Sequence, residues 1–414
     1  MGGLFIILIK NKITNFYILI LSLISFWVTV STIYMTLPIY FKLVGLSTTE
    51  IGVLIALGTL SGAFSTIFLG WLSDRIGRKF LLVLALFSYS VCFLFFYFFQ
   101  GFGYFVIFRL IEGVGAFSVP ALATAIVADI FPTEKRGQAM GVYESVGGIG
   151  KTLGPLIAGL VLTMGSFSTY FIFCSLSVFI SVFIVLILLK ETLPQKKAHL
   201  VPAETQCLAE HDVKSSVTKT WKPLALFYSA VFLRSMGQSA VTPLLSLFFA
   251  ERLGEISMIE MSILFCVPGF MNMVLSHIAG RVSDKTGRKK PFLVAILFFS
   301  IAPLLYIPCY SFMQALLIRF IEGATSSFVV PLTSAYLADL LTTTGQSGWS
   351  GTGFGVSQFL STQTSTFGSV FGGYIIEAFG YNELFLAAST FSFASLLPLL
   401  KVPEPCAINK RLTA

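Results

Sequence analysis

The chain has 414 residues, of which 56% are hydrophobic and 11% are charged, and its mean hydropathy is +0.87. Soluble domains hold about 45–50% apolar and about 25% charged residues, so this composition excludes an ordinary soluble fold. The formal charge of +8 does not predict a nucleic-acid partner, because the basic residues form short clusters between apolar runs, as in the loops of membrane proteins.

A membrane-spanning helix needs about 20 mostly apolar residues, so the chain has room for about twelve spans with short loops. The run from Phe16 to Phe41 is too long for a cleaved signal peptide, and we interpret it as an uncleaved first span. The predicted spans are residues 15–41, 50–72, 80–99, 102–130, 138–163, 167–189, 223–250, 257–281, 291–309, 312–340, 351–379 and 383–401.

The longest hydrophilic stretch, residues 190–222, lies in the middle of the chain. We interpret it as a cytoplasmic linker between an N-terminal six-helix half, residues 1–189, and a C-terminal six-helix half, residues 223–414. With both termini in the cytoplasm, most of the 27 basic residues lie on the cytoplasmic side, and only Lys42 and Arg252 lie outside. The positive-inside rule therefore favours this orientation for a multi-pass membrane protein, which we expect in the plasma membrane.

Three segments of the first half recur in the second half at one offset. Gly70–Lys79 is similar to Gly280–Lys289, Phe108–Gly113 is similar to Ile318–Gly323, and Ala128-Asp129 recurs as Ala338-Asp339. The offset from Asp74 to Asp284 is 210 residues, and the other matches share it. A duplication in the same orientation predicts two parallel repeats of six helices around a central cavity, with a binding site near the membrane midplane.

The first repeated segment has the pattern Gly-x-x-x-Asp-Arg-x-Gly-Arg-Lys between spans two and three. Both copies resemble the signature of the major facilitator superfamily, and the resemblance covers nearly the whole chain. In that family the loop aspartate contacts the opposite half and holds the outward-open state shut on the cytoplasmic side. The alternative is that the basic residues only enforce topology. The resemblance implies conformational gating by Asp74, Arg75, Gly77, Arg78, Asp129, Asp284, Gly287, Arg288 and Asp339.

Arg109 and Glu112 lie inside span four. A charge near the middle of the bilayer costs at least about 2.5–3.5 kcal/mol, so such residues usually face a cavity or a partner. Resemblance to the drug:proton antiporter branch, which carries an arginine here followed by a glycine, implies that Arg109 tunes a nearby carboxyl and that Glu112 carries protons. The alternative is an intrahelical structural pair, which the duplicate at Arg319 and Glu322 favours.

Span five contains a run of glycines followed by a proline. This run resembles the Gly-Pro antiporter motif of exporters in the superfamily, although Ala158 stands where a second glycine is common. Glycines allow close helix packing, and a proline bends the helix. The corresponding part of span eleven lacks the proline, which agrees with an exporter, whereas the alternative is a packing helix in an importer. The predicted packing and kink residues are Gly150, Gly154, Pro155 and Gly159.

Span five also carries Glu144 and Lys151, seven residues apart on one helix face. This spacing predicts a charged cavity wall with Glu144 as a second candidate proton carrier. Lys151 is not part of the family motif, and a lysine there could bind an anionic group. The alternative is a salt bridge between the two residues or to another helix.

Polar stripes at helical spacing follow spans one, seven and eleven. Lipid-facing surfaces would not favour such stripes, so we expect them to line the central cavity, whereas the alternative is helix–helix hydrogen bonding. With Lys151, the predicted cavity residues are Thr29, Thr32, Thr36, Arg234, Gln238, Thr242, Gln358 and Thr362.

The motifs together predict a secondary active transporter that works as a monomer by alternating access, with lipid, a small-molecule substrate and protons as partners. A proton-coupled exporter of small amphipathic molecules is the leading hypothesis. An importer or anion carrier of the same fold is the first alternative, and a non-transporting membrane sensor is the second. The sequence has no Walker-type loop and no hydrolase motif, and its six cysteines have no metal-ligand spacing, so we expect no enzyme activity, cofactor or metal.

Overall fold

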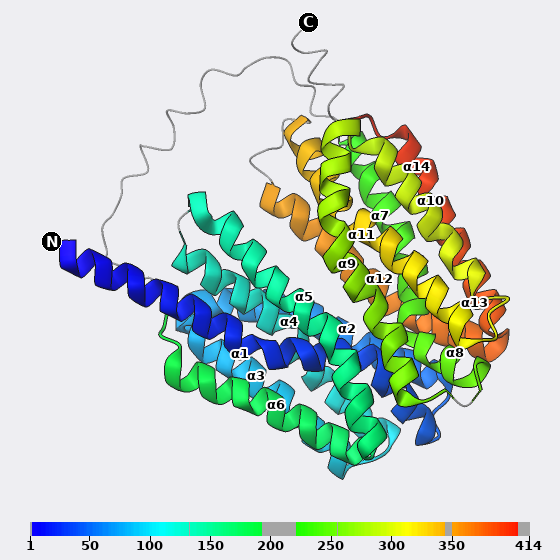
Figure 1. The fold of residues 1–414 in the computed structure, drawn as a ribbon, viewed down its shortest axis with the longest axis horizontal. Coiled ribbons are helices and arrows are strands. Elements are labelled where there is room, and N and C mark those ends of the chain that lie inside the picture. Colours follow the sequence, from blue (N-terminus) through cyan, green and yellow to red (C-terminus); the bar gives the residue numbers. More distant parts are fainter. Residues whose placement is uncertain (1, 132, 193–220, 255, 344–349, 405–414) are drawn as a thin grey trace, which may run out of the picture.

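The computed structural model describes all residues except 1, 132, 193–220, 255, 344–349 and 405–414. The described part is almost entirely helical (Figure 1). Its elements are α1 (Gly2–Leu43), α2 (Thr48–Ile76), α3 (Arg78–Phe98), α4 (Phe102–Ile130), α5 (Thr133–Met164), α6 (Phe167–Leu188), α7 (Lys222–Val241), η2 (Thr242–Leu244), α8 (Leu245–Arg252), α9 (Met258–Thr286), α10 (Lys289–Leu305), α11 (Phe312–Thr343), α12 (Ser350–Ala378), α13 (Tyr381–Ala394) and α14 (Leu396–Lys401).

Among the described residues, nine helices are long and apolar enough to cross a membrane. The three other predicted spans are also helical, but each departs from a uniform apolar helix. The seventh is interrupted by η2, where Pro243 cannot donate a backbone hydrogen bond. The ninth, α10, has only 17 residues, and the eleventh, α12, is rich in glycine, serine and threonine over its first half. The prediction of an all-α membrane fold is confirmed.

The local structure repeats between the halves as the sequence does. Ser47 and Glu50 form a capping box at the start of α2, and Ser257 and Glu260 form the same box at the start of α9. In each box the serine side chain accepts a backbone N–H while the glutamate accepts the N–H of the serine, so two free donors of the helix end are satisfied. The same signal thus starts the second span of each half.

Helices α1–α6 pack into one bundle and α7–α14 into another (Figure 1). Within the first bundle α2 packs on α4, α3 on α6 and α1 on α5. In the second, α9 packs on α11 and α7 on α13. The bundles meet along α2 and α12 and along α5 and α9. This is the parallel-repeat arrangement that the duplication predicts.

The two ends of the molecule differ in how the bundles meet. We call the end with the α2–α3 and α9–α10 loops the basic end, because it carries Arg75, Arg78 and Lys289. At the opposite end one apolar core continues across both bundles and joins residues such as Phe41 and Phe248. Towards the basic end the C-terminal bundle has a separate core around Phe227 and Tyr336. The bundles are therefore joined at the opposite end.

Candidate functional site

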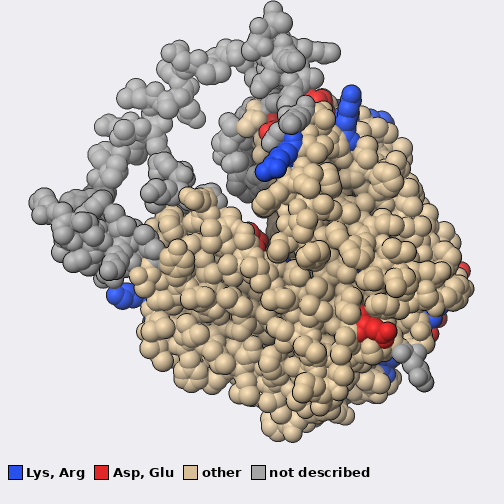
Figure 2. Space-filling view, in the orientation of Figure 1, with Lys and Arg blue, Asp and Glu red and all other residues tan. Residues whose placement is uncertain are grey.

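A cavity of about 830 Å³ lies between the two bundles. Figure 2 shows the molecule hollowed between its two lobes on this side. The wall is built by α1, α2, α4, α5 and α12, and it combines aromatic, hydroxyl and charged side chains. The lining residues that bear on function are Trp27, Tyr34, Thr59, Arg109, Glu112, Phe117, Glu144, Lys151, Gln358, Phe359 and Thr362. Such a concave site with few polar groups is typical of small-molecule binding.

Arg109 and Glu112 lie together on the wall of this cavity. Arg109 Nη1 donates to Glu112 Oε2, and Arg109 Nε donates to the carbonyl of Leu54 at 3.0 Å. The two residues are only 3% and 2% exposed. Helix α2 can approach Arg109 closely because Gly58 has no side chain. A Cβ at this position would lie 2.4 Å from Arg109 Nη2. The structure thus shows both an intrahelical pair and a carboxyl at the cavity. The first is the geometry that a structural pair requires, and the second is the geometry that a proton carrier requires.

The duplicate pair has a different environment. Arg319 Nη1 donates to Glu322 Oε2 at 2.7 Å, and Arg319 Nε donates to the carbonyl of Leu264 at 2.8 Å. The hydroxyl of Tyr306 also donates to Glu322 Oε2 at 2.8 Å, whereas Phe96 occupies the matching position in the first half. Glu322 lines a separate small pocket inside the second bundle and does not line the central cavity.

Glu144 and Lys151 both line the central cavity with exposed side chains. Lys151 Nζ lies 4.3 Å from the centre of the Trp27 ring, which gives a cation–π contact. Within the described part of the chain, no ion pair joins either residue to a partner. The salt bridge between Glu144 and Lys151 that the sequence left open is therefore absent from this structure.

The glycines of the predicted packing motif lie at close helix contacts. A Cβ on Gly150 would lie 2.6 Å from Trp27 Cβ, and one on Gly154 would lie 1.9 Å from Ser31 Oγ. Gly159 meets the other bundle instead, where its Cβ would lie 2.5 Å from Ser262 Oγ. Pro155 lies inside α5 and removes the N–H that would bond the carbonyl four residues earlier.

Two of the three polar stripes do not lie on the cavity wall. Thr32 and Thr36 are buried against α6, where their hydroxyls bond the hydroxyl of Tyr170, and Thr29 bonds the carbonyl of Ser25. These contacts lie inside the first bundle. In an apolar medium, hydroxyls are stabilised by partners on neighbouring helices, and here Tyr170 of α6 is such a partner. The cavity placement expected for these threonines is thus corrected.

In the second bundle, Arg234 also lies off the cavity. It donates to Gln238 Oε1 at 3.2 Å and lies over Phe299. Gln238 and Thr242 line the small pocket near Glu322, so the cavity placement expected for these three residues is likewise corrected. Only the stripe of span eleven contributes to the central cavity, through Gln358 and Thr362.

The repeated loops at the basic end are held within their own bundles. Arg78 bonds Asp74 at 2.9 Å and also pairs with Asp129, while Asp74 is 63% exposed. In the copy, Arg288 bonds Asp339 at 3.0 Å. Arg75 lies over the ring of Trp71, 3.9 Å from its centre. The side chain of Asp284 lies outside the described residues.

Two carboxylates that the sequence analysis missed complete these loops. Glu191, just after α6, accepts the backbone N–H groups of Arg78 and Lys79 at 3.0 and 3.1 Å. Glu404, just after α14, accepts the same groups of Arg288 and Lys289 at 2.9 and 3.1 Å. They cap the start of α3 and α10, where the helix dipole favours negative charge. The available signal was an acidic residue directly after the last span of each half.

The preceding glycines make these caps possible. Gly77 and Gly287 have φ values of +123° and +87°, which residues with a Cβ rarely adopt. A Cβ on Gly77 would also lie 2.7 Å from the Glu191 carboxylate. Glycine is therefore required at this turn for both its backbone conformation and the space it leaves.

Polar contacts between described residues of the two bundles lie towards the opposite end. Thr49 N donates to Glu377 Oε2 at 3.0 Å, and Lys42 pairs with Glu251 at 3.6 Å. At the cavity wall, the hydroxyls of Thr59 on α2 and Thr366 on α12 are hydrogen-bonded at 3.0 Å. These contacts close the end of the molecule that lies away from the basic loops.

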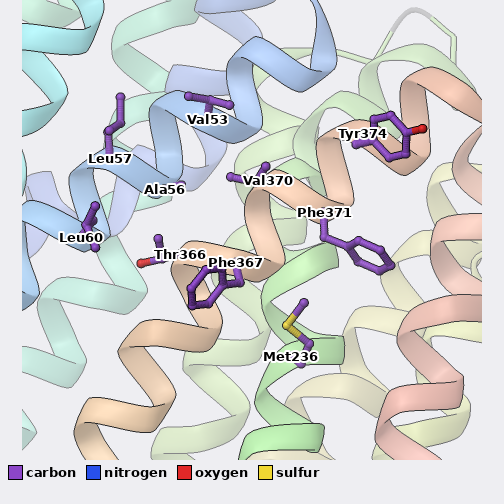
Figure 3. A pocket seen from close by; sticks show the side chains of 10 residues that line it. All are labelled: Val53, Ala56, Leu57, Leu60, Met236, Thr366, Phe367, Val370, Phe371 and Tyr374. Atoms are coloured by element: carbon purple, nitrogen blue, oxygen red, sulfur yellow. The ribbon is translucent and has the colours of Figure 1, made fainter.

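A second hollow of about 650 Å³ lies between α2 and α12, with one wall completed by α7 (Figure 3). Its lining is apolar apart from Thr366 and the hydroxyl of Tyr374, and it includes Val53, Leu57, Met236 and Val370. None of the described residues that line it is charged. The central cavity is therefore the site with the chemistry to recognise a charged or polar solute.

Known proteins resemble this chain over nearly its full length. Over 364 residues it is 27% identical to the multidrug resistance protein MdtG of Klebsiella pneumoniae, covering 86% of this chain and 84% of the relative. Over 390 residues it is 25% identical to the multi-drug resistance efflux pump PmrA of Streptococcus pneumoniae, covering 91% and 94%. These relatives support the resemblance to the drug antiporter branch.

Solved structures share the fold at low sequence identity. The nucleoside transporter NupG has a TM-score of 0.74 at 13% identity, covering 95% of this chain and 99% of its own. A D-xylose–proton symporter has a TM-score of 0.72 at 16% identity, covering 95% and 98%. The sequence also matches the Major Facilitator Superfamily profile at residues 18–229 and again at 227–413. This chain is a multi-pass membrane protein that belongs to the major facilitator superfamily.

Proposed function

We propose that this protein is a secondary active exporter of small amphipathic compounds in the plasma membrane, driven by counter-movement of protons. The observation that carries the proposal is a buried carboxyl, Glu112, on the wall of a cavity between two bundles that are joined at one end. The names of two relatives, a multidrug resistance protein and a multi-drug efflux pump, support the direction of transport.

Alternating access accounts for a cavity closed at one end. With the orientation that the positive-inside rule predicts, the basic end is cytoplasmic and the structure is inward-facing. Rocking of the two halves about the central site would separate α2 from α12 at the opposite end and bring the basic loops together. Residues 190–222 would be the cytoplasmic linker that lets the halves move. Asp74 and Arg78, with their copies, would then stabilise the state that is closed at the basic end.

Proton coupling is assigned to Glu112, with Arg109 as its partner. A buried carboxylate needs a counter-charge, and here a single guanidinium supplies it. A substrate that disturbs this pair would favour the protonated carboxyl, and loss of that proton would favour the pair again. Glu144, which is exposed in the cavity, is a second candidate carrier.

An importer or anion carrier of the same fold is the second candidate, and the cavity-lining ammonium of Lys151 favours it. The two candidates differ in the direction of proton flow. A membrane sensor without transport would show no flux at all.

The test is to purify the full chain, reconstitute it in proteoliposomes with a pH gradient and add a panel of fluorescent amphipathic compounds. We expect compound movement against proton movement in the wild type and loss of this coupling in Glu112→Gln. Glu322→Gln changes the duplicate pair, which lies off the central cavity, and is the matched control that should retain coupled flux. Protons moving with the compound would instead establish the importer, and flux without proton movement would refute the coupling.

A further inference from the structure

Of the described residues that line the central cavity, four have charged side chains, and these four are not equivalent. Arg109 and Glu112 neutralise each other through a direct ion pair. Glu144 and Lys151 have no ion partner within the described residues. Among the residues that the structure describes, the cavity therefore offers a solute one carboxylate and one ammonium that are not in an ion pair.

The ammonium of Lys151 is held in place. It lies over Trp27, and α1 and α5 are brought together there by Gly147 and Gly150, whose Cβ atoms would lie 3.1 and 2.6 Å from Trp27 atoms. A cation–π contact orients the ammonium but does not neutralise its charge. Its remaining N–H donors can bind a carboxylate or another anionic group of a solute.

Glu144 lies two turns away from Lys151 towards the basic end of the same helix. Seven residues at about 1.5 Å each place the two positions about 10 Å apart along α5, and a spacing of seven keeps them on one face. An unpaired charge next to low-dielectric walls is costly, so a solute that supplies the opposite charge gains more there than it would in water.

The rest of the cavity is neutral and partly aromatic. From the facing wall, α12 contributes the amide of Gln358, the hydroxyl of Thr362 and the ring of Phe359. On the other helices, Phe117 and Tyr34 add further rings. Such surfaces suit a flat apolar body, with the polar groups fixing its orientation.

We propose that the cavity selects amphipathic zwitterions: the anionic group of the solute binds Lys151, its cationic group binds Glu144, and an apolar body about 10 Å long lies between them. This inference rests on the proposed transport function and narrows its substrate class. It also explains why an ammonium lines the cavity of a protein whose relatives include efflux pumps.

The test uses a series of biphenyl probes and the full chain in lipid nanodiscs, with binding measured by calorimetry and no proton gradient. The zwitterionic probe carries a carboxylate at one end and an aminomethyl group at the other. One control probe has the carboxylate esterified, and another has the aminomethyl group replaced by methyl. We expect the zwitterion to bind at least about tenfold more tightly than either control, since charged hydrogen bonds are involved.

Variants then assign each end of the probe. Lys151→Gln should abolish the preference for the zwitterion over the ester, and Glu144→Gln should abolish the preference over the methyl probe. Lys151→Arg keeps a cation above Trp27 and should restore the preference, which assigns the preference to the positive charge. Retained binding of the ester probe by Lys151→Gln shows that this variant is folded. Lys401→Gln changes an exposed lysine at the end of α14 and should leave all three affinities unchanged.

Three results would overturn the proposal: equal affinities of the wild type for the zwitterion and the ester, an undiminished preference in Lys151→Gln, or no binding of the zwitterion. Because no gradient is present, a failure of proton coupling in proteoliposomes leaves this test intact. Conversely, a transporter without charge preference would refute only the substrate class and leave the exporter proposal standing.

Discussion

The substitution Gly52→Ala tests whether the closed opposite end is one of two alternating states. A Cβ on Gly52 would lie 2.3 Å from the carbonyl oxygen of Ser369, where α2 meets α12. Neither helix backbone can yield without a shift of the two bundles, and overpacking of this kind typically costs about 1–3 kcal/mol. If the bundles separate here in the other state, the substitution destabilises only the state that this structure shows. A bias of about 1–3 kcal/mol changes the ratio of the two states by about 5–150-fold.

The assay measures how fast a membrane-impermeant maleimide reaches a cysteine in the cavity. Thr362→Cys, in a background without the six native cysteines, reports access from the basic end in inverted vesicles and from the opposite end in intact cells. While the other state is minor, the rate from the opposite end is proportional to its population. We therefore expect Gly52→Ala to raise that rate by about 5–150-fold.

Two matched glycines provide the controls. A Cβ on Gly113 would lie 1.9 Å from the carbonyl oxygen of Gly58, but this contact lies within one bundle and is expected in both states. Gly113→Ala should therefore lower the unfolding temperature without changing the ratio of labelling rates. Gly103→Ala meets no atom within 4 Å and should change neither quantity. Unchanged labelling in Gly52→Ala, or an equal rise in Gly113→Ala, would refute the reasoning.

Three further predictions concern two sets of ion pairs and one hydrogen bond between the bundles. Arg78→Ala removes the contacts to Asp74 and Asp129, so thermal unfolding should show a loss of about 1–3 kcal/mol, whereas Arg75→Ala, whose exposed side chain lies over Trp71, should remain near wild type. Arg319→Met leaves the carboxylate of Glu322 without its counter-charge and should cost about 3–5 kcal/mol, and the double variant with Glu322→Leu should recover much of the loss in the same measurement. Glu377→Ala removes the acceptor for Thr49 N–H and should raise labelling from the opposite end, but less than Gly52→Ala does.

The fold could be predicted because its signals are local. Apolar runs, their flanking glycines and the constant offset of 210 residues determine the number, order and symmetry of the helices. The pairing of Arg109 with Glu112 was also accessible, since residues three apart on a helix are neighbours. The break at Thr242–Leu244 was not predicted, although Pro243 was visible in the sequence.

The face that each polar stripe presents could not be predicted, because it depends on the neighbouring helix. Thr32 faces into the first bundle because Tyr170 supplies a hydroxyl there, while Thr362, in a stripe of the same spacing, lies on the cavity wall. Glu191 was missed for a related reason. It caps the N–H of Arg78 from a position 113 residues away in the chain, and no local pattern joins the two.

The anchoring of the two buried arginines has a consequence for how the protein is made. Arg109 and Arg319 each bond a carboxylate of their own helix and a carbonyl of a neighbouring helix in the same bundle. The first six helices can therefore leave the insertion machinery with this charge already neutralised, before the last six have been synthesised. Domains of large proteins generally fold as units during synthesis, so each bundle can assemble before it meets the other. Two polypeptides produced from a split gene could therefore pair in the membrane to form the transporter.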